Sequence, residues 1–315
     1  MGYKLAGYEV IGCCEIDEKM IRMYKKNHHP KLAYNMDIRE LAAKTEFPEE
    51  LKDLDILDGS PPCSVFSLAG SREDGWGVEK KFREGQSEQR LDDLFLHFIA
   101  LAKKLQPKVV VAENVKGLII GNAKGWVHKI VEAFDDAGFD AQIFLFNAAR
   151  MGVPQARERV FFIGRRKDLG FSPAKMTFNE ELIPFGKVRE PEGIEVTAPV
   201  AKALLKYRQA GDRNLADISK RLRRKNAGFT QPIFADNEPI GTLTAGGNPV
   251  RMFDGKEMTK NDIIHCQTFP EDYDFDGNDP QYVCGMSVPP FMMQRIAGEI
   301  FRQWFKGDED GLQAK

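Results

Sequence analysis

The residues Asp58-Gly59-Ser60-Pro61-Pro62-Cys63 decide how the first half of this chain is interpreted. They follow the apolar run Leu54–Leu57, which predicts a short buried strand. The strand therefore ends on a rigid Pro-Pro turn that carries one thiol. In open α/β sheets, ligands bind outside the carboxyl ends of the strands, which is where this turn places Cys63. A free cysteine is often only a small buried hydrophobe, so Cys63 by itself leaves a structural role open.

A second strand ends one βαβ unit further along the chain. The segment Leu91–Leu105 has apolar residues at helical spacing, and Lys108–Ala112 is a buried β run that leads into Glu113-Asn114-Val115. Because adjacent parallel strands end at the same edge of a sheet, we expect Cys63 and Glu113 to lie several ångströms apart. A thiol and a carboxyl group that face one pocket suit covalent catalysis with an acid beside the nucleophile.

Further helices and strands alternate on both sides of this unit, which predicts an α/β fold. The predicted strands are Tyr8–Cys14, Leu32–Asn35, Asp140–Phe146 and Val160–Gly164, and the predicted helices include Glu18–Lys26 and Ile38–Lys44. Glu15 and Asp37 follow the first two strands, where carboxylates suit ribose hydroxyls. Both also precede helices, so a helix-capping role stays open for each.

The pattern changes after residue 167, where proline and charge increase and periodicity weakens. We therefore expect a first domain over residues 1–167 and a smaller, irregular domain over 168–274. An amphipathic helix over Phe291–Phe305 predicts that residues 275–315 return to the first domain.

Composition and charge exclude several classes of protein. The apolar and charged fractions are those of a globular protein, and no apolar run is long enough for a transmembrane helix. The start of the chain lacks a signal pattern, so we expect a cytoplasmic location and no membrane contact. The five cysteines have no Cys-x-x-Cys spacing, which argues against disulfides and a metal site.

The net charge of −2 is unevenly distributed along the chain. One basic run covers Arg150 to Lys167 and a second covers Lys220–Lys225. Two such runs could hold DNA phosphates, although each could equally be a solvated face.

With these elements in order, the sequence resembles a C5-cytosine DNA methyltransferase of the bacterial or phage type. The matching segments are Gly59-Ser-Pro-Pro-Cys63-Ser-Val-Phe-Ser67, Glu113-Asn114-Val115, Gln155-Ala-Arg157-Glu-Arg159, Thr242-Leu-Thr244, Phe269-Pro270 and Gly285-Met-Ser-Val-Pro-Pro290. They occur in the order that the family has and extend from about Leu5 to Ala297. The resemblance implies a Rossmann-like fold that binds S-adenosylmethionine, with a smaller target-recognition domain.

The resemblance also implies a mechanism. Cys63 would add to C6 of cytosine and make C5 nucleophilic, while Glu113, with a pKa raised in a dry pocket, would bond to N3. Asn114 would orient Glu113. Arg157, and also Arg159, would hold the O2 side of the base or lower the thiol pKa. The base must leave the duplex, and the loop Ser64–Arg90 would close on it.

The remaining site residues follow from the same resemblance. Residues implied in cofactor binding are Glu15, Ile16, Asp37, Ile38, Pro61, Leu94 and Ser287, and those implied in DNA binding are Ser64, Gln155, Arg157 and Thr242. The expected partners are double-stranded DNA and a cognate restriction endonuclease, and the expected state is a monomer.

The sequence departs from the family in two places. The family's opening strand and its Phe-x-Gly-x-Gly turn have no counterpart before Met1-Gly2-Tyr3, so we expect unpaired strand edges and an incomplete cofactor site. A mis-assigned or truncated start and an impaired product both remain open. Met286 stands where the family more often has Asn. A catalytically impaired DNA-binding remnant and an RNA cytosine methyltransferase are therefore the alternative functions.

Overall fold

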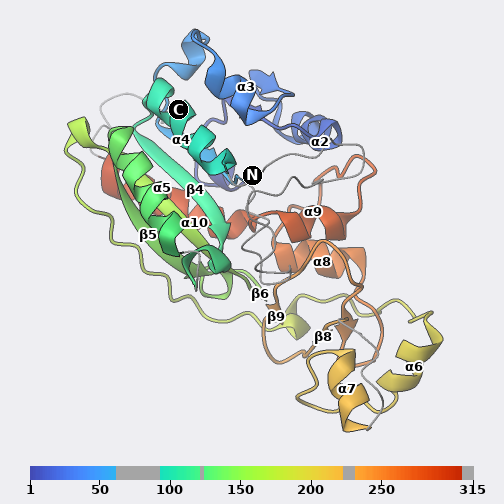
Figure 1. The fold of residues 1–315 in the computed structure, drawn as a ribbon. Coiled ribbons are helices and arrows are strands. Elements are labelled where there is room, and N and C mark those ends of the chain that lie inside the picture. The colour runs from blue at the N-terminus through green and yellow to red at the C-terminus, as the bar shows by residue number, and fades with distance from the viewer. Residues whose placement is uncertain (62–92, 121–123, 223–230, 307–315) are drawn as a thin grey trace. The chain divides into compact units, whose positions relative to one another are not determined.

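A computed structural model describes residues 1–61, 93–120, 124–222 and 231–306 of the chain. The chain forms two compact units (Figure 1). The sheet unit consists of Gly7–Phe146, Glu158–Met176 and Gly298–Lys315, and the mixed unit consists of Met1–Ala6, Asn147–Arg157 and Thr177–Ala297. The division differs from the expected domain boundaries. The chain passes from the sheet unit to the mixed unit at residue 147, returns to the sheet unit at 158 and enters the mixed unit again at 177.

The sheet unit contains a four-stranded sheet in the order β3-β4-β7-β5. Its strands are β3 (Ile56–Gly59), β4 (Val109–Val115), β7 (Glu158–Arg166) and β5 (Phe139–Asn147). β3 and β4 are parallel, as the βαβ pattern predicts, and β4 and β7 are antiparallel. The first two strands, β1 (Gly12–Cys14) and β2 (Leu32–Tyr34), form a separate parallel pair. Among the strands that the structure describes, β1 therefore bonds only to β2, and β3 only to β4.

Apolar side chains on one face of this sheet pack under two helices, α4 (Leu94–Leu105) and α5 (Lys124–Asp136). Val110 and Ala112 of β4 and Phe162 of β7 lie in the same buried cluster as Phe98 of α4. α4 ends where Gln106 adopts a left-handed conformation, directly before Pro107. The helices α2 (Glu18–His28) and α3 (Ile38–Ala43) follow β1 and β2. The expected helix over Leu91–Leu105 is confirmed from Leu94 on.

The last helix ends in the sheet unit, where α10 (Pro290–Ile300) continues as a π-helical turn over Phe301–Phe305. The ring of Phe305 lies 6.4 Å from that of Tyr8, and Trp304 stacks on Phe171 at 5.7 Å. Residues 298–306 thus belong to the sheet unit, while residues 275–297 belong to the mixed unit.

The mixed unit has short elements around two apolar clusters. Its helices are α1 (Gly2–Leu5), α6 (Pro199–Leu205), α7 (Leu215–Arg221), α8 (Lys260–Gln267), α9 (Pro280–Met286) and most of α10. Its strands are β6 (Gln155–Ala156), β8 (Ile233–Phe234), β9 (Ile240–Gly241) and β10 (Val250–Arg251). α9 was not expected from the sequence, although its signal is present: Asp279 caps the helix and Pro280 occupies its first turn.

Candidate active site

Glu113 and Arg159 form an ion pair at the carboxyl end of β4. In the antiparallel ladder, Glu113 lies opposite Phe161 and Arg159 lies opposite Val115, so the two are diagonal neighbours on one face. Arg159 Nε lies 2.9 Å from Glu113 Oε1, and both side chains are nearly buried. Burial lowers the pKa of Arg159 from its ordinary value, while the charge of Glu113 and its hydrogen bond oppose that shift. The sheet therefore presents a carboxylate and a guanidinium together.

Asn114 connects this strand end to the turn that carries the nucleophile motif. Its Nδ2 donates to the carbonyl oxygen of Pro61 at 3.1 Å, and its Oδ1 accepts from the backbone N–H of Val115 at 2.9 Å. Asn114 was expected to orient Glu113. In the structure its side chain instead holds the backbone two residues before Cys63. The reason is the alternation of a strand, which points Asn114 and Glu113 to opposite faces.

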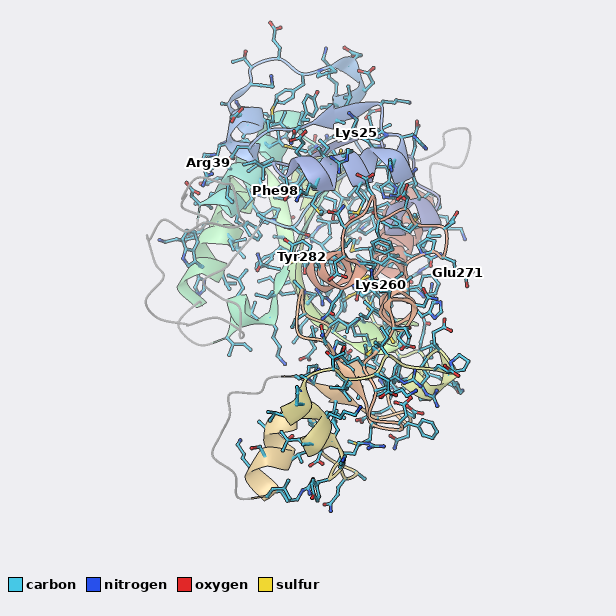
Figure 2. The ribbon with its side chains drawn as sticks, turned by 90° about the vertical axis from the view of Figure 1, so that its right-hand side faces the viewer. Lys25, Arg39, Phe98, Lys260, Glu271 and Tyr282 are labelled. Atoms are coloured by element: carbon cyan, nitrogen blue, oxygen red, sulfur yellow. The ribbon has the colours of Figure 1, made fainter. Side chains whose placement is uncertain are left out.

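Gly59 is the last residue of β3, and it lies very close to the helix α4. A Cβ atom at this position would lie 2.4 Å from the ring of Phe98 in α4, the residue labelled in Figure 2. Only glycine fits such an approach without moving the aromatic ring. The glycine of the Gly59-Ser60-Pro61 segment is thus explained by helix–strand packing.

Cys63 and Ser64, and with them the loop Ser64–Arg90, lie outside the described residues. The structure describes the other four cysteines, and burial raises the pKa of each thiol. The pKa rises to about 11 for Cys13 and to about 12 for Cys14 and Cys284, and well above the ordinary value for Cys266. These four thiols therefore have the character of structural cysteines.

The predicted cofactor residues Glu15 and Asp37 both follow the paired strands β1 and β2. Glu15 Oε1 accepts from the N–H of Asp17 at 2.8 Å, and Asp37 caps α3 through the N–H of Arg39. Asp37 Oδ2 also pairs with Arg39 Nη1 at 2.9 Å. The capping role that the sequence left open is therefore present for Asp37.

An apolar side chain lies beside Glu15. Ile16 is 41% exposed, although isoleucine gains by burial. A carboxylate next to an exposed aliphatic side chain, both after a strand end, fits the ribose and the adenine of a nucleoside. The residues present therefore fit the nucleoside part of S-adenosylmethionine.

The other predicted cofactor residues differ in what they expose. Pro61 and Leu94 are buried, and Ile38 packs against the apolar cluster under α3. Ser287 belongs to the mixed unit, where its hydroxyl donates to the carbonyl of Cys284 at 3.2 Å. Leu94 offers almost no surface in this conformation, because it is part of the core at the start of α4.

In the mixed unit, Gln155 and Arg157 hold one backbone residue from two sides. Gln155 Oε1 accepts from the N–H of Leu243 at 3.0 Å, and Arg157 Nη1 donates to its carbonyl at 2.8 Å. Arg157 Nη2 donates to the carbonyl of Gly285, also at 2.8 Å. Gln155 is 0% exposed and Arg157 is 1% exposed. Neither side chain offers surface to a base or to DNA here, which differs from the roles expected from the sequence.

Gln155 and Arg157 together form a clamp on the segment Thr242–Gly247. Thr242 Oγ1 donates to the carbonyl of Ala156 at 3.1 Å, and a Cβ atom on Gly285 would lie 2.3 Å from the backbone nitrogen of Ala245. The clamp, the Thr242 bond and the close approach at Gly285 together determine where the segment begins. Thr242, a predicted DNA contact, lies at its exposed start.

The first basic run forms intramolecular ion pairs. The pairs are Arg165–Asp140, Arg166–Asp168 and Lys167–Asp135, at 3.2, 2.8 and 2.6 Å. Together with the pairing of Arg159, they show that four of the basic side chains in this run have acidic partners within the protein. In the second run, Arg221 pairs with Asp212 at 2.6 Å, and residues 223–225 lie outside the described part.

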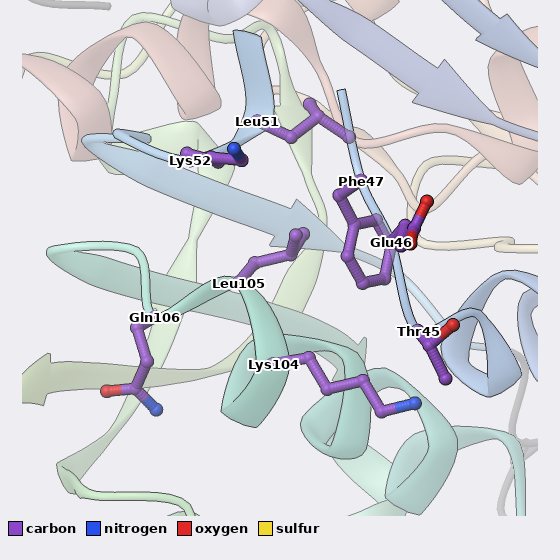
Figure 3. Close-up of a pocket in the computed structure, with 8 residues that line it drawn as sticks. All are labelled: Thr45, Glu46, Phe47, Leu51, Lys52, Lys104, Leu105 and Gln106. Atoms are coloured by element: carbon purple, nitrogen blue, oxygen red, sulfur yellow. The ribbon is translucent and has the colours of Figure 1, made fainter. Parts of the chain in front are cut away.

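A pocket of about 540 Å³ is lined by residues 45–47, 51–52 and 104–106 (Figure 3). Phe47, Leu51 and Leu105 contribute its apolar wall, and Lys104 donates to the carbonyls of Ala42 and Lys44. All residues that line it precede β3 or β4 in the chain, so it lies at the amino ends of those strands. Ligands of such sheets bind at the opposite, carboxyl edge.

The described helices include none that is long and apolar enough to cross a bilayer. Across residues 1–61, 93–120, 124–222 and 231–306, acidic, histidine and cysteine side chains form no group that could hold a metal ion.

Known proteins resemble this chain over its whole length. The type II methyltransferase M.NgoPII of Neisseria gonorrhoeae is 28% identical over 326 residues, which cover 95% of this chain and 91% of that protein. M.FnuDI of Fusobacterium nucleatum is 39% identical over 172 residues, but these cover only 45% of its length.

Solved structures show the same fold. A DNA modification methyltransferase encoded within an E. coli prophage superposes with a TM-score of 0.69 at 19% identity, over 96% of this chain and 94% of that one. The Dnmt2 methyltransferase of S. pombe gives a TM-score of 0.60 at 16% identity and the same coverage. The family model for C-5 cytosine-specific DNA methylases matches residues 1–302. This chain therefore belongs to the C-5 cytosine-specific DNA methylase family.

Proposed function

We propose that this protein transfers a methyl group from S-adenosylmethionine to carbon 5 of a cytosine in a specific sequence of duplex DNA, through a covalent adduct with Cys63. The observation that carries the proposal is the Arg159–Glu113 pair at the end of β4. Glu113 lies on β4, the strand next to β3, and Asn114 bonds to Pro61, two residues before Cys63. These contacts support a site in which a nucleophile and a carboxyl group share one sheet edge.

The chemistry requires both groups. Carbon 5 of cytosine is a weak nucleophile, and addition of the Cys63 thiolate to carbon 6 converts the C5–C6 double bond into an enamine. The electron density moves toward N3, where Glu113 donates a hydrogen bond or proton. Glu113, a carboxylate paired with Arg159, would take up a proton from solvent as the base enters, and the guanidinium would bond to O2. After C5 has taken the methyl group, loss of the C5 proton to a base expels the Cys63 thiolate, and return of the N3 proton to Glu113 restores the aromatic ring.

S-adenosylmethionine, when bound, supplies the electrophilic methyl group. Glu15 would bind its ribose, and Ile16 would pack on its adenine. The target carbon is inaccessible inside a duplex, so the cytosine must be extruded before Cys63 can reach it. The relatives named above act in type II systems, which supports a cognate restriction endonuclease as a functional partner of this protein.

Methyl transfer from labelled S-adenosylmethionine tests the proposal with the 315-residue chain. We expect unmethylated DNA to be labelled at carbon 5 of cytosine and tRNA to remain unlabelled. Preferential labelling of tRNA would favour the RNA enzyme, and cofactor-free DNA binding without any transfer would favour the remnant.

A second experiment tests the nucleophile directly. DNA that contains 5-fluorocytosine cannot lose the substituent at carbon 5, so an enzyme that uses a covalent adduct should remain attached to it. We expect a denaturation-resistant complex that maps to the peptide with Cys63 and that is lost in Cys63→Ser. Transfer by Cys63→Ser at the wild-type rate would exclude the proposed adduct.

A further inference from the structure

The turn after β10 exposes one aromatic side chain, Phe253. Its exposed fraction of 65% is the largest among the large hydrophobic side chains of the described residues. Single exposed hydrophobic residues are common on protein surfaces and carry no meaning alone. The surroundings of this residue distinguish it.

The backbone of this turn is held on both sides. The N–H of Gly255 donates to the carbonyl of Arg251 at 3.0 Å, and Gly255 has a φ of 72°, which favours glycine. Arg208 donates from Nε to the carbonyl of Met252 at 2.7 Å and from Nη2 to that of Phe253 at 3.1 Å. The backbone of Phe253 therefore loses little freedom when its ring meets a partner.

Two arginine side chains, Arg251 and Arg189, contact the turn and its aromatic ring. Arg251 is fully buried, and its Nη2 lies 2.9 Å from Asp254 Oδ2. The guanidinium of Arg189 lies 4.7 Å from the centre of the Phe253 ring, and Asp236 holds that guanidinium at 2.8 Å. The arginine supports the ring in place, because a cation over an aromatic face attracts it.

The helices that pack on the small apolar core next to the turn are rich in positively charged side chains. Val250 of β10 packs in one apolar cluster with residues of α6, α7 and β8, which lie together in Figure 1. The basic segment, residues 196–222, supplies α6 and α7 and contains six Lys or Arg residues and two acidic residues, whereas the whole chain has a net charge of −2. Such a concentration of positive charge attracts nucleic-acid phosphates.

We propose that Phe253 packs its ring against the DNA in a groove and is a specificity-determining residue of the mixed unit. The proposal rests on the function proposed above. The basic segment would hold the phosphates, while the fixed ring would contact base edges or sugars. Aromatic side chains inserted from rigid elements contribute to binding in this way in other DNA-binding proteins.

Duplex binding and methyl transfer by Phe253→Ala test this role. We expect the Kd for unmethylated duplex DNA and the KM for DNA to rise about tenfold, with kcat nearly unchanged. Phe253→Trp should restore most of the affinity. Leu182→Ala is the matched control, since Leu182 is 45% exposed in the same unit but lies outside the basic segment. Melting temperatures should stay unchanged in all three variants.

The outcomes separate this inference from the proposed function. If the wild-type protein methylates DNA and Phe253→Ala binds and methylates DNA equally well, the role of Phe253 is refuted and the enzyme assignment stands. If the wild-type protein neither binds nor methylates duplex DNA, the proposed function fails and the DNA contact fails with it. An equal loss in Leu182→Ala would also refute a specific role for the ring.

Discussion

Arg159 Nε lies 2.9 Å from Glu113 Oε1. The two residues lie on neighbouring strands, β7 and β4, and are 46 positions apart in the sequence. The register of β4 and β7 makes this contact, since it sets the two residues diagonally on one face. Arg157, only two residues earlier, lies in the other compact unit and bonds to backbone carbonyls. This difference supports the proposal that Arg159 contacts the base and that Arg157 has a positioning role.

Replacement of Arg159 by glutamine should reduce both stability and activity. The carboxylate of Glu113 would stay nearly buried without its cation, and we expect a loss of about 3 kcal/mol in unfolding free energy. Thermal and urea denaturation measure this effect. Arg302→Gln is the matched control, because the Arg302–Glu299 pair is solvent-exposed, and it should leave the melting temperature nearly unchanged. Equal stability of both variants would contradict a structural contribution of the buried pair.

Glu113→Gln should keep the fold and lose the chemistry. Glutamine has nearly the same shape but cannot transfer a proton, so we expect kcat to fall at least about 100-fold. The melting temperature should also fall, because Arg159 would stay nearly buried without its anion, while the Kd for S-adenosylmethionine should change little. Methyl transfer and calorimetric titration measure these quantities, and a variant that retains full kcat would exclude Glu113 as the group that acts at N3.

Arg157→Lys tests whether Arg157 positions the Thr242–Gly247 segment. One ammonium group cannot reach both the Leu243 and Gly285 carbonyls as the two guanidinium nitrogens do. We expect a loss of about 2 kcal/mol in stability and a raised KM for DNA, with a smaller effect on kcat. A large fall in kcat at unchanged stability and KM would instead support direct contact with the base.

Gly285→Ala should displace the same segment from the other side. The new Cβ atom would lie 2.3 Å from the backbone of Thr244 and Ala245, so that backbone must move. We expect a higher KM for DNA and a lower melting temperature. Gly298→Ala is the control, because Gly298 lies within another helix, α10, has open space around it, and alanine favours helix. Identical behaviour of both variants would mean that the close approach is unimportant.

Thiol labelling should single out one cysteine. Because the pKa values of Cys13, Cys14, Cys266 and Cys284 are raised, these groups are neutral thiols at pH 7.5, and their labelling should accelerate only as the pH approaches 11. A catalytic Cys63 should react with iodoacetamide much faster at pH 7.5. Peptide mass spectrometry of briefly labelled native protein measures the five rates, and equally fast labelling of Cys14 would contradict the expected selectivity.

The sequence by itself determined the α/β class, the strands and the parallel pairing of β3 with β4. Apolar runs and βαβ spacing are local signals, and they also placed Glu113 at a strand end. Secondary structure in the mixed unit was harder to predict, since its short helices and strands depend on packing in two small clusters.

Only the tertiary structure decided which partners the polar side chains have. The sequence analysis gave Arg157 and Arg159 one shared role beside the base or the thiol. In the structure, β7 begins at Glu158, and the N–H of Arg157 bonds back to Gln155, so the alternation is interrupted between the two arginines. Their guanidinium groups then meet groups 46 and up to 128 residues away. Such pairings depend on strand register and burial, which short-range sequence patterns do not contain.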